Sequence, residues 1–149
     1  MRTLLYIVIL GVLIAVPAER SDVGNLLPVE VILIDKDDQG IKIQTDTGNA
    51  GAGDDLEAAY QNLRERAPAD IYLDTANYLI LSGEAQELAP QLSAYLKAHV
   101  KVCIGEGELD VTEVAAYLAT HTPDTHLCEL NKEAEIQVLT QAENGFSLE

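Results

Sequence analysis

Apolar and polar positions alternate with strand periodicity near the start of the chain. Residues 28–35 are β-rich and mostly apolar, and residues 41–45 alternate apolar with polar side chains. The turn cluster at 36–40 separates them, so the pattern predicts an antiparallel hairpin whose second strand has one face in water. Residues 48–53 contain three glycines and predict a flexible connection.

Apolar side chains at helical spacing predict about three helices further along the chain. These cover residues 55–66, 88–99 and about 111–121. Pro68 ends the first helix. The residues expected to cap or begin the helices are Asp54 or Asp55, Pro90, and Asp110 or Thr112.

Short apolar runs predict further strands at 77–82, 100–104 and 125–130, with a lead-in or short strand at 70–74. Strand, helix, strand, helix, strand from residue 77 onward implies right-handed crossovers and parallel pairing. The fold class is therefore α/β: a small mixed sheet with an N-terminal antiparallel hairpin followed by β-α-β-α-β.

The expected domain organisation has four parts. Residues 1–18 form an export segment, residues 19–27 a linker, and residues 28–130 a single mixed α/β domain. For the tail at 131–149 the sequence allows two alternatives, a fraying helix or an edge strand over 135–140.

The export segment combines Arg2 with an uninterrupted apolar run of 13 residues from Leu4 to Val16. A helix of that length spans roughly 20 Å, which is short for a bilayer core of about 30 Å. Small or apolar residues at Val16-Pro17-Ala18 predict a signal peptide cut between Ala18 and Glu19. The alternative is an uncleaved short anchor. Both predict an extracytoplasmic protein, secreted or held at the cell membrane.

Acidic residues dominate the charge of the chain. Twenty-five Asp and Glu stand against nine Lys and Arg, a net charge of -16, and cleavage after Ala18 would remove Arg2 and give 8 − 25 = -17. Such a body repels phosphate backbones and anionic membrane surfaces. Nucleic acid is therefore excluded as the expected partner, and membrane contact is expected only through the N-terminal segment.

The only cysteines in the sequence are Cys103 and Cys128. In an oxidising exterior they would form a disulfide worth roughly 3 kcal/mol in the chain-entropy model. The alternative is two thiols buried on neighbouring strands.

Two clusters contain residue types that bind metals. Asp35, Asp37, Gly40 and Asp46 match positions of a calcium loop, but strands are expected on both sides, so a hairpin turn is favoured. The sequence His126-Leu-Cys128, with His121 nearby, contains zinc-ligand types without a recognisable ligand spacing. Packing roles are therefore expected in both places, and no metal or cofactor is predicted.

The remaining candidates for chemistry are also weak. A glycine-rich loop before a helix can bind phosphate, but acidic residues follow this one and would repel the anion. Pairs of acids can perform glycosidase chemistry only when their environments separate their pKa values. The glycines are Gly48, Gly51 and Gly53, and the acid pairs are Glu84 with Glu87 and Glu106 with Glu108. No catalytic residue is predicted from them.

Three segments resemble the N-terminal domain of the Ger(x)C family of spore-germination receptor C-subunits. They are Glu19-Arg-Ser-Asp-Val-Gly-Asn-Leu26 with the apolar run to Asp35, then Asp54-Asp-Leu-Glu-Ala-Ala59, and Tyr78-Leu-Ile-Leu-Ser-Gly-Glu84 followed by Leu88. The resemblance covers about Glu19 to Leu130. The chain differs in having no cysteine after the export segment and no counterpart of the larger C-terminal part.

The resemblance implies a membrane-proximal domain without enzymatic activity that contacts other proteins. We therefore expect an exported, non-catalytic protein-binding or assembly module, whose partner is a protein and whose working surface is an apolar patch or sheet edge. The alternatives are a secreted small carboxylate-dependent hydrolase and a purely structural domain.

Overall fold

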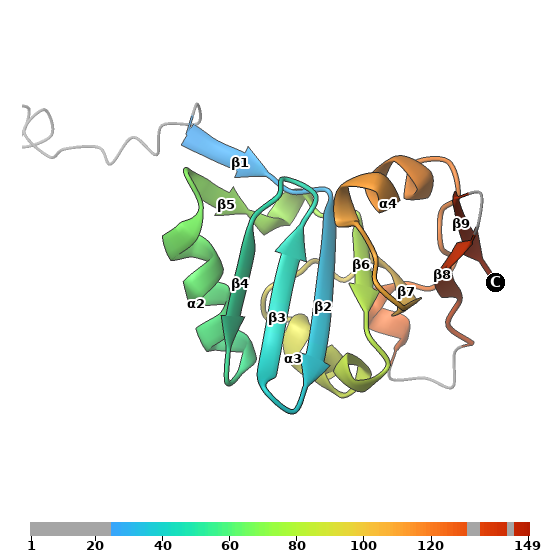
Figure 1. Cartoon of the computed structure of the whole chain (residues 1–149), viewed down its shortest axis with the longest axis horizontal. Helices are drawn as coiled ribbons and strands as arrows, with labels where there is room; N and C mark the ends of the chain where they lie inside the picture. Colours follow the sequence, from blue (N-terminus) through green and yellow to red (C-terminus); the bar gives the residue numbers. More distant parts are fainter. Residues whose placement is uncertain (1–24, 131–134, 143–144) are drawn as a thin grey trace, which may run out of the picture.

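The computed structural model describes residues 25–130, 135–142 and 145–149, and it shows a mixed α/β fold (Figure 1). The strands are β1 (Leu26–Pro28), β2 (Val31–Asp37), β3 (Gly40–Thr45), β4 (Ala50–Gly53), β5 (Asp70–Tyr72), β6 (Tyr78–Leu81), β7 (Lys101–Glu106), β8 (Val138–Ala142) and β9 (Gly145–Leu148). The helices are α2 (Leu56–Arg66), α3 (Ala89–Leu92) and α4 (Val111–Leu118), with 3-10 turns η2 (Leu73–Thr75), η3 (Glu84–Leu88) and η4 (Leu127–Glu129).

Seven strands form the main sheet in the order β4-β3-β2-β6-β7-β8-β9, and β1 pairs with β5 separately. The four middle strands β2, β6, β7 and β8 run parallel, while β3, β4 and β9 add antiparallel pairs. This confirms the predicted mixed sheet and its N-terminal hairpin. The predicted linker at 19–27 ends in β1.

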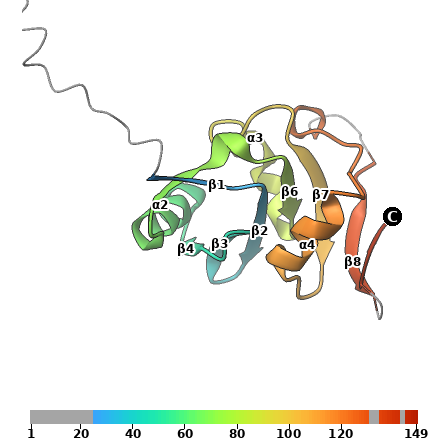
Figure 2. The ribbon, with the colours of Figure 1, turned by 90° about the horizontal axis from the view of Figure 1, so that it is seen from above.

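Each face of the sheet has its own hydrophobic cluster, because side chains alternate along the strands. Ile32 and Ile34 of β2 lie in the cluster under α2, η3 and α3, whereas Val31 and Leu33 lie in the cluster under α4. Figure 2 shows α3 and α4 on opposite sides of β6 and β7. In Figure 1, α4 leaves the near face of β3 and β4 uncovered.

Two predicted helices have the expected positions and caps. The Asp55 side chain accepts a hydrogen bond from the backbone N of Ala58 at 2.7 Å at the start of α2. At the start of α4, the Asp110 side chain accepts a hydrogen bond from the backbone N of Thr112 at 2.8 Å. These carboxylates satisfy backbone donors that have no partner inside the helix.

The predicted helix over 88–99 is wrong in extent. The chain forms η3 and then a single α-helical turn, α3, which contains Pro90 and ends at Leu92. The Ser93 hydroxyl donates to the Pro90 carbonyl at 2.9 Å, a local bond that competes with helix continuation. Residues 93–96 are turns and a bend, and His99 is exposed.

The predicted strand at 125–130 is also wrong. The backbone N of Val102 donates to the Thr125 carbonyl at 2.8 Å, and the chain then turns into η4. The neighbouring half of β7 pairs instead with β8, with Ile104 opposite Val138. Two segments therefore share one strand edge, and the last parallel strand lies in the tail whose structure the sequence left open.

Residues 50–53 of the glycine-rich segment form an edge strand, β4, in place of the expected flexible connection. A Cβ atom on Gly51 would lie 2.3 Å from the Leu63 backbone N, and one on Gly53 would lie 2.5 Å from the Ala59 backbone N. Helix α2 therefore packs directly on the backbone of β4, at a distance that only glycine permits. These glycines serve packing.

The predicted export segment, residues 1–18, lies outside the described residues. Within residues 25–130, 135–142 and 145–149, no helix has the length and apolarity needed to cross a bilayer.

Candidate functional site

A polar groove lies where β6 and β7 end. The chain leaves β6 toward η3 and α3 on one face of the sheet, and it leaves β7 toward α4 on the other. Such a switch between neighbouring parallel strands opens a crevice at their carboxyl ends, where α/β proteins bind ligands. The groove here has a volume of about 370 Å³. Its polar lining comprises Asp35, Lys42, Gln44, Ser82 and Glu108.

Three neighbouring strands place polar residues in one row across the floor of this groove. Asp35 of β2 stands opposite Lys42 of β3 in the antiparallel register. On the other side of β2, the Ser82 backbone N donates to the Ile34 carbonyl at 3.0 Å. The Ser82 hydroxyl oxygen accepts from the backbone N of Lys36 at 3.1 Å, which fixes this side chain beside Asp35.

The segment before α4 forms the wall of the groove. A Cβ on Gly105 would lie 2.7 Å from Ile80 Cγ2 and 2.8 Å from Leu109 Cδ1, so glycine allows Leu109 to pack onto the sheet. A second cleft of about 480 Å³ runs along the same wall and shares Gln44, Glu108 and Leu109 with the first. Together they form the groove between the uncovered sheet face and the 107–112 segment.

Two acids of the calcium-loop pattern, Asp37 and Asp46, accept hydrogen bonds from the backbone. Asp37 Oδ1 accepts from the backbone N of Gln39 at 2.7 Å within the hairpin turn. The Asp46 carboxylate accepts from the backbone N of Glu30 at 3.1 and 3.3 Å. Across the described ranges, no group of three or more His, Cys, Asp or Glu side chains is placed to hold a metal ion.

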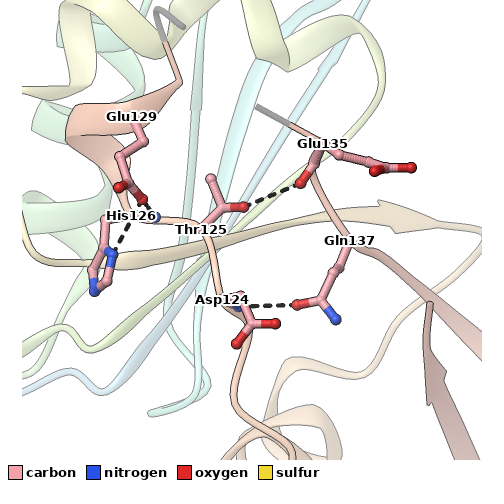
Figure 3. A network of polar contacts seen from close by, with 6 residues as sticks. All are labelled: Asp124, Thr125, His126, Glu129, Glu135 and Gln137. Atoms are coloured by element: carbon pink, nitrogen blue, oxygen red, sulfur yellow. Dashed lines mark hydrogen bonds and ion pairs between the residues drawn. The ribbon is translucent and has the colours of Figure 1, made fainter. Parts of the chain in front are cut away.

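His121, His126 and Cys128 do not converge either. His121 stacks on Tyr117 with 4.2 Å between ring centroids. The Glu129 carboxylate accepts from the His126 backbone N at 2.9 Å and lies 3.3 Å from His126 Nδ1 (Figure 3). These contacts shape the turn around η4.

The same turn is tied to the segment that leads into β8. The Asp124 backbone N donates to Gln137 Oε1 at 2.9 Å, and the Thr125 hydroxyl donates to the Glu135 carbonyl at 3.3 Å (Figure 3). The network therefore positions the final hairpin.

The members of the two acid pairs have different surroundings. Glu87 forms an ion pair with Lys36, and Glu84 is exposed at the start of η3. Glu106 ends β7, and Glu108 lines the groove. The structure thus brings Glu108 near Asp35, a pairing of acids from different elements that the sequence pairs did not include. The sequence places Asp35 at the end of the first predicted strand, but no local pattern indicates that Glu108 lies near it.

Both cysteines are free in the structure, so the disulfide considered from the sequence is not formed there. Cys103 is buried in the cluster beneath α4, whereas Leu127, the neighbour of Cys128, packs in the opposite cluster. Burial raises the pKa of the Cys103 thiol to about 12, since a charged thiolate is poorly solvated there. Cys128 is exposed.

A thiol-reactive maleimide at neutral pH is therefore expected to label Cys128 rapidly and Cys103 only after unfolding. Mass spectrometry of the folded protein should show one adduct at Cys128. Two rapid adducts would contradict the buried position of Cys103, and no adduct before reduction would indicate the disulfide.

The raised pKa of Cys103 also makes the stability of the fold depend on pH. The protonated thiol favours the folded state below its unfolded pKa of about 9, and this contribution to the free energy of unfolding is lost as the pH rises toward 12.

The two edges of the main sheet differ in their protection. At β4, the Ala52 backbone N donates to Asn62 Oδ1 of α2 at 3.1 Å, so a side chain occupies this edge. At β9, Val138 and Glu149 exchange backbone hydrogen bonds of 2.7 and 3.0 Å. Bonded and non-bonded pairs alternate in an antiparallel ladder, so the N–H and C=O groups of Phe146 and Leu148 point away from β8. No partner from the described ranges covers them.

Aromatic side chains lie beside the β9 edge. The Phe146 and Tyr117 rings are 5.7 Å apart between centroids, and the His121 ring stacks on that of Tyr117. Phe146 and Leu148 are half-buried against the α4 cluster. The edge therefore combines unpaired backbone groups with a partly apolar surface.

Comparisons of the chain with protein-family models, curated proteins and solved structures found no match. The groove and the β9 edge are therefore the two features that bear on function.

Proposed function

We propose that this chain is an exported, non-catalytic binding module that contacts a partner protein through the edge of β9. The observation that carries the proposal is the open row of backbone groups at Phe146 and Leu148, at the end of the sheet farthest from β4 (Figure 1). An extended segment of a partner can add to such an edge as a further strand. Natural proteins usually protect strand edges, so an open one suits binding.

Charge favours a basic partner segment over a second copy of the chain. The full sequence carries -16, and two copies would repel each other at the short range of strand pairing. Main-chain hydrogen bonds would supply affinity, and the half-buried Phe146 and Leu148 would supply side-chain contacts.

The export part of the proposal rests on the sequence. It is supported by the apolar run from Leu4 to Val16 and by the Val16-Pro17-Ala18 site. The resemblance to Ger(x)C proteins supports a membrane-proximal role and stays a prediction.

Labelling of intact cells tests the location of the domain. A maleimide that cannot cross membranes should label Cys128 if the domain is extracytoplasmic, and absence of labelling in intact cells together with labelling after lysis would contradict export.

The carboxylate-dependent hydrolase ranks second, and the groove is the site that favours it, because Asp35 and Glu108 both line it. Against this alternative, the Ser82 oxygen accepts a backbone hydrogen bond from Lys36, and no hydrogen bond to a side-chain base is made within the described ranges. Ser82 is therefore not activated as a nucleophile by a neighbouring base, and a hydrolase here would depend on Asp35 and Glu108 alone.

Photo-crosslinking from the β9 edge tests the proposed function. A photoreactive amino acid at Ser147, installed in the full chain in cells that export it, is expected to give one discrete protein adduct. The same group at Glu57, on the exposed face of α2, is the control and should not give that adduct. Identical adducts from both positions, or none from Ser147, would count against a specific β9 contact.

A further inference from the structure

The polar lining of the groove has unused hydrogen-bonding capacity. Within residues 25–130, 135–142 and 145–149, the side chains of Asp35, Lys42, Gln44 and Glu108 make no ion pair or hydrogen bond. Asp35 and Lys42 stand opposite each other in register without forming an ion pair. Polar groups from β2, β3 and the 107–112 wall thus converge on one open volume without satisfying each other.

The charges in the groove select the chemistry of a ligand. Two carboxylates, Asp35 and Glu108, face one ammonium, Lys42, so the charge of the lining is negative. The net charge of -16 on the whole chain adds a field of the same sign. An anion is therefore disfavoured, and an ammonium group would gain charge-assisted hydrogen bonds from both carboxylates.

The remaining lining groups suit a ligand with hydroxyl or amide groups. The Gln44 amide both donates and accepts, and the Ser82 hydroxyl keeps its proton to donate. The combined clefts, about 370 and 480 Å³, admit a molecule of metabolite size.

We infer that this groove binds a small organic cation, an amine that also carries a hydroxyl or amide group. The ammonium lies between Asp35 and Glu108, and the neutral polar group lies along Gln44 and Ser82. None of these four residues belongs to β9, so the inference can be tested independently of the proposed protein contact.

Three probes that share a four-carbon chain with a terminal hydroxyl test the inference. They are 4-aminobutan-1-ol, butane-1,4-diol and 4-hydroxybutanoate, whose second ends are an ammonium, a hydroxyl and a carboxylate. Titrations at low ionic strength are followed by the backbone amide NMR signals of Ser82, Gly105 and Gly107. The amino alcohol should produce saturable shifts at these residues, with an affinity at least about tenfold above that for either other probe.

Charge-matched variants distinguish the effect of the groove carboxylates on binding from the effect of the overall negative charge of the protein. The double variant Asp35→Asn/Glu108→Gln should weaken binding of the amino alcohol by at least about tenfold. The double variant Glu57→Gln/Glu84→Gln changes the net charge equally at exposed positions outside the groove and should leave the affinity within about twofold. Equal weakening by both variants, equal affinity for all three probes, or no saturable shift would overturn the inference.

Discussion

Gly51→Val is expected to lower the free energy of unfolding by about 3–5 kcal/mol, a large share of the 5–15 kcal/mol typical of a domain. Its Cβ would lie 2.3 Å from the Leu63 backbone N and 2.4 Å from the Ala59 carbonyl oxygen. Both obstacles belong to the backbone of α2, so no rotamer change relieves them. Urea unfolding followed by circular dichroism measures the loss.

Gly83→Ala is the matched control for this prediction. A Cβ at Gly83 meets nothing within 4 Å, and the residue has φ -53°, which alanine adopts without strain. Its stability should stay within about 0.5 kcal/mol of the parent chain. If Gly51→Val proved as stable as Gly83→Ala, α2 could not be packed on β4 as described.

Local signals in the sequence were enough to predict part of the fold. The hairpin of β2 and β3, helices α2 and α4, and the caps Asp55 and Asp110 all depend on residues close together in the chain. Apolar periodicity and capping chemistry act over a few residues, so a single sequence contains them.

Elements that depend on distant partners were not predictable in this way. The glycines of β4 have the composition of a loop, and their role becomes visible only when α2 lies on them. Thr125 accepts a backbone hydrogen bond from β7, and Val138 begins the strand that pairs with β7. The sequence does not indicate which of these two segments forms the longer pairing. The sequence alone therefore does not decide between a helix and a strand for the tail, although β8 and β9 complete the sheet.

The candidate sites show the same division. Asp35 and Lys42 stand opposite each other in the β2–β3 hairpin, which the sequence predicts without its exact register. Ser82 joins their row only through the parallel pairing of β2 with β6, and Glu108 only through the path of the wall segment. The open edge at β9 depends on the final hairpin and on the strand order, which no local pattern specifies.

Leu148→Pro is expected to abolish partner binding at β9 while preserving the fold. The Leu148 N–H points away from β8, so proline removes a donor that the β8–β9 ladder does not use, and edge strands tolerate this residue. An added strand would lose a main-chain hydrogen bond and meet the proline ring. Leu148→Ala removes the same side chain but keeps the N–H, so it separates loss of packing from loss of the edge.

The most direct test is the yield of the Ser147 photo-adduct in the Leu148→Pro and Leu148→Ala chains, with folding checked by their unfolding curves. Strand addition at β9 predicts that the adduct is retained in Leu148→Ala and lost in Leu148→Pro at similar stability. An adduct of equal yield in both chains would contradict binding through the β9 edge.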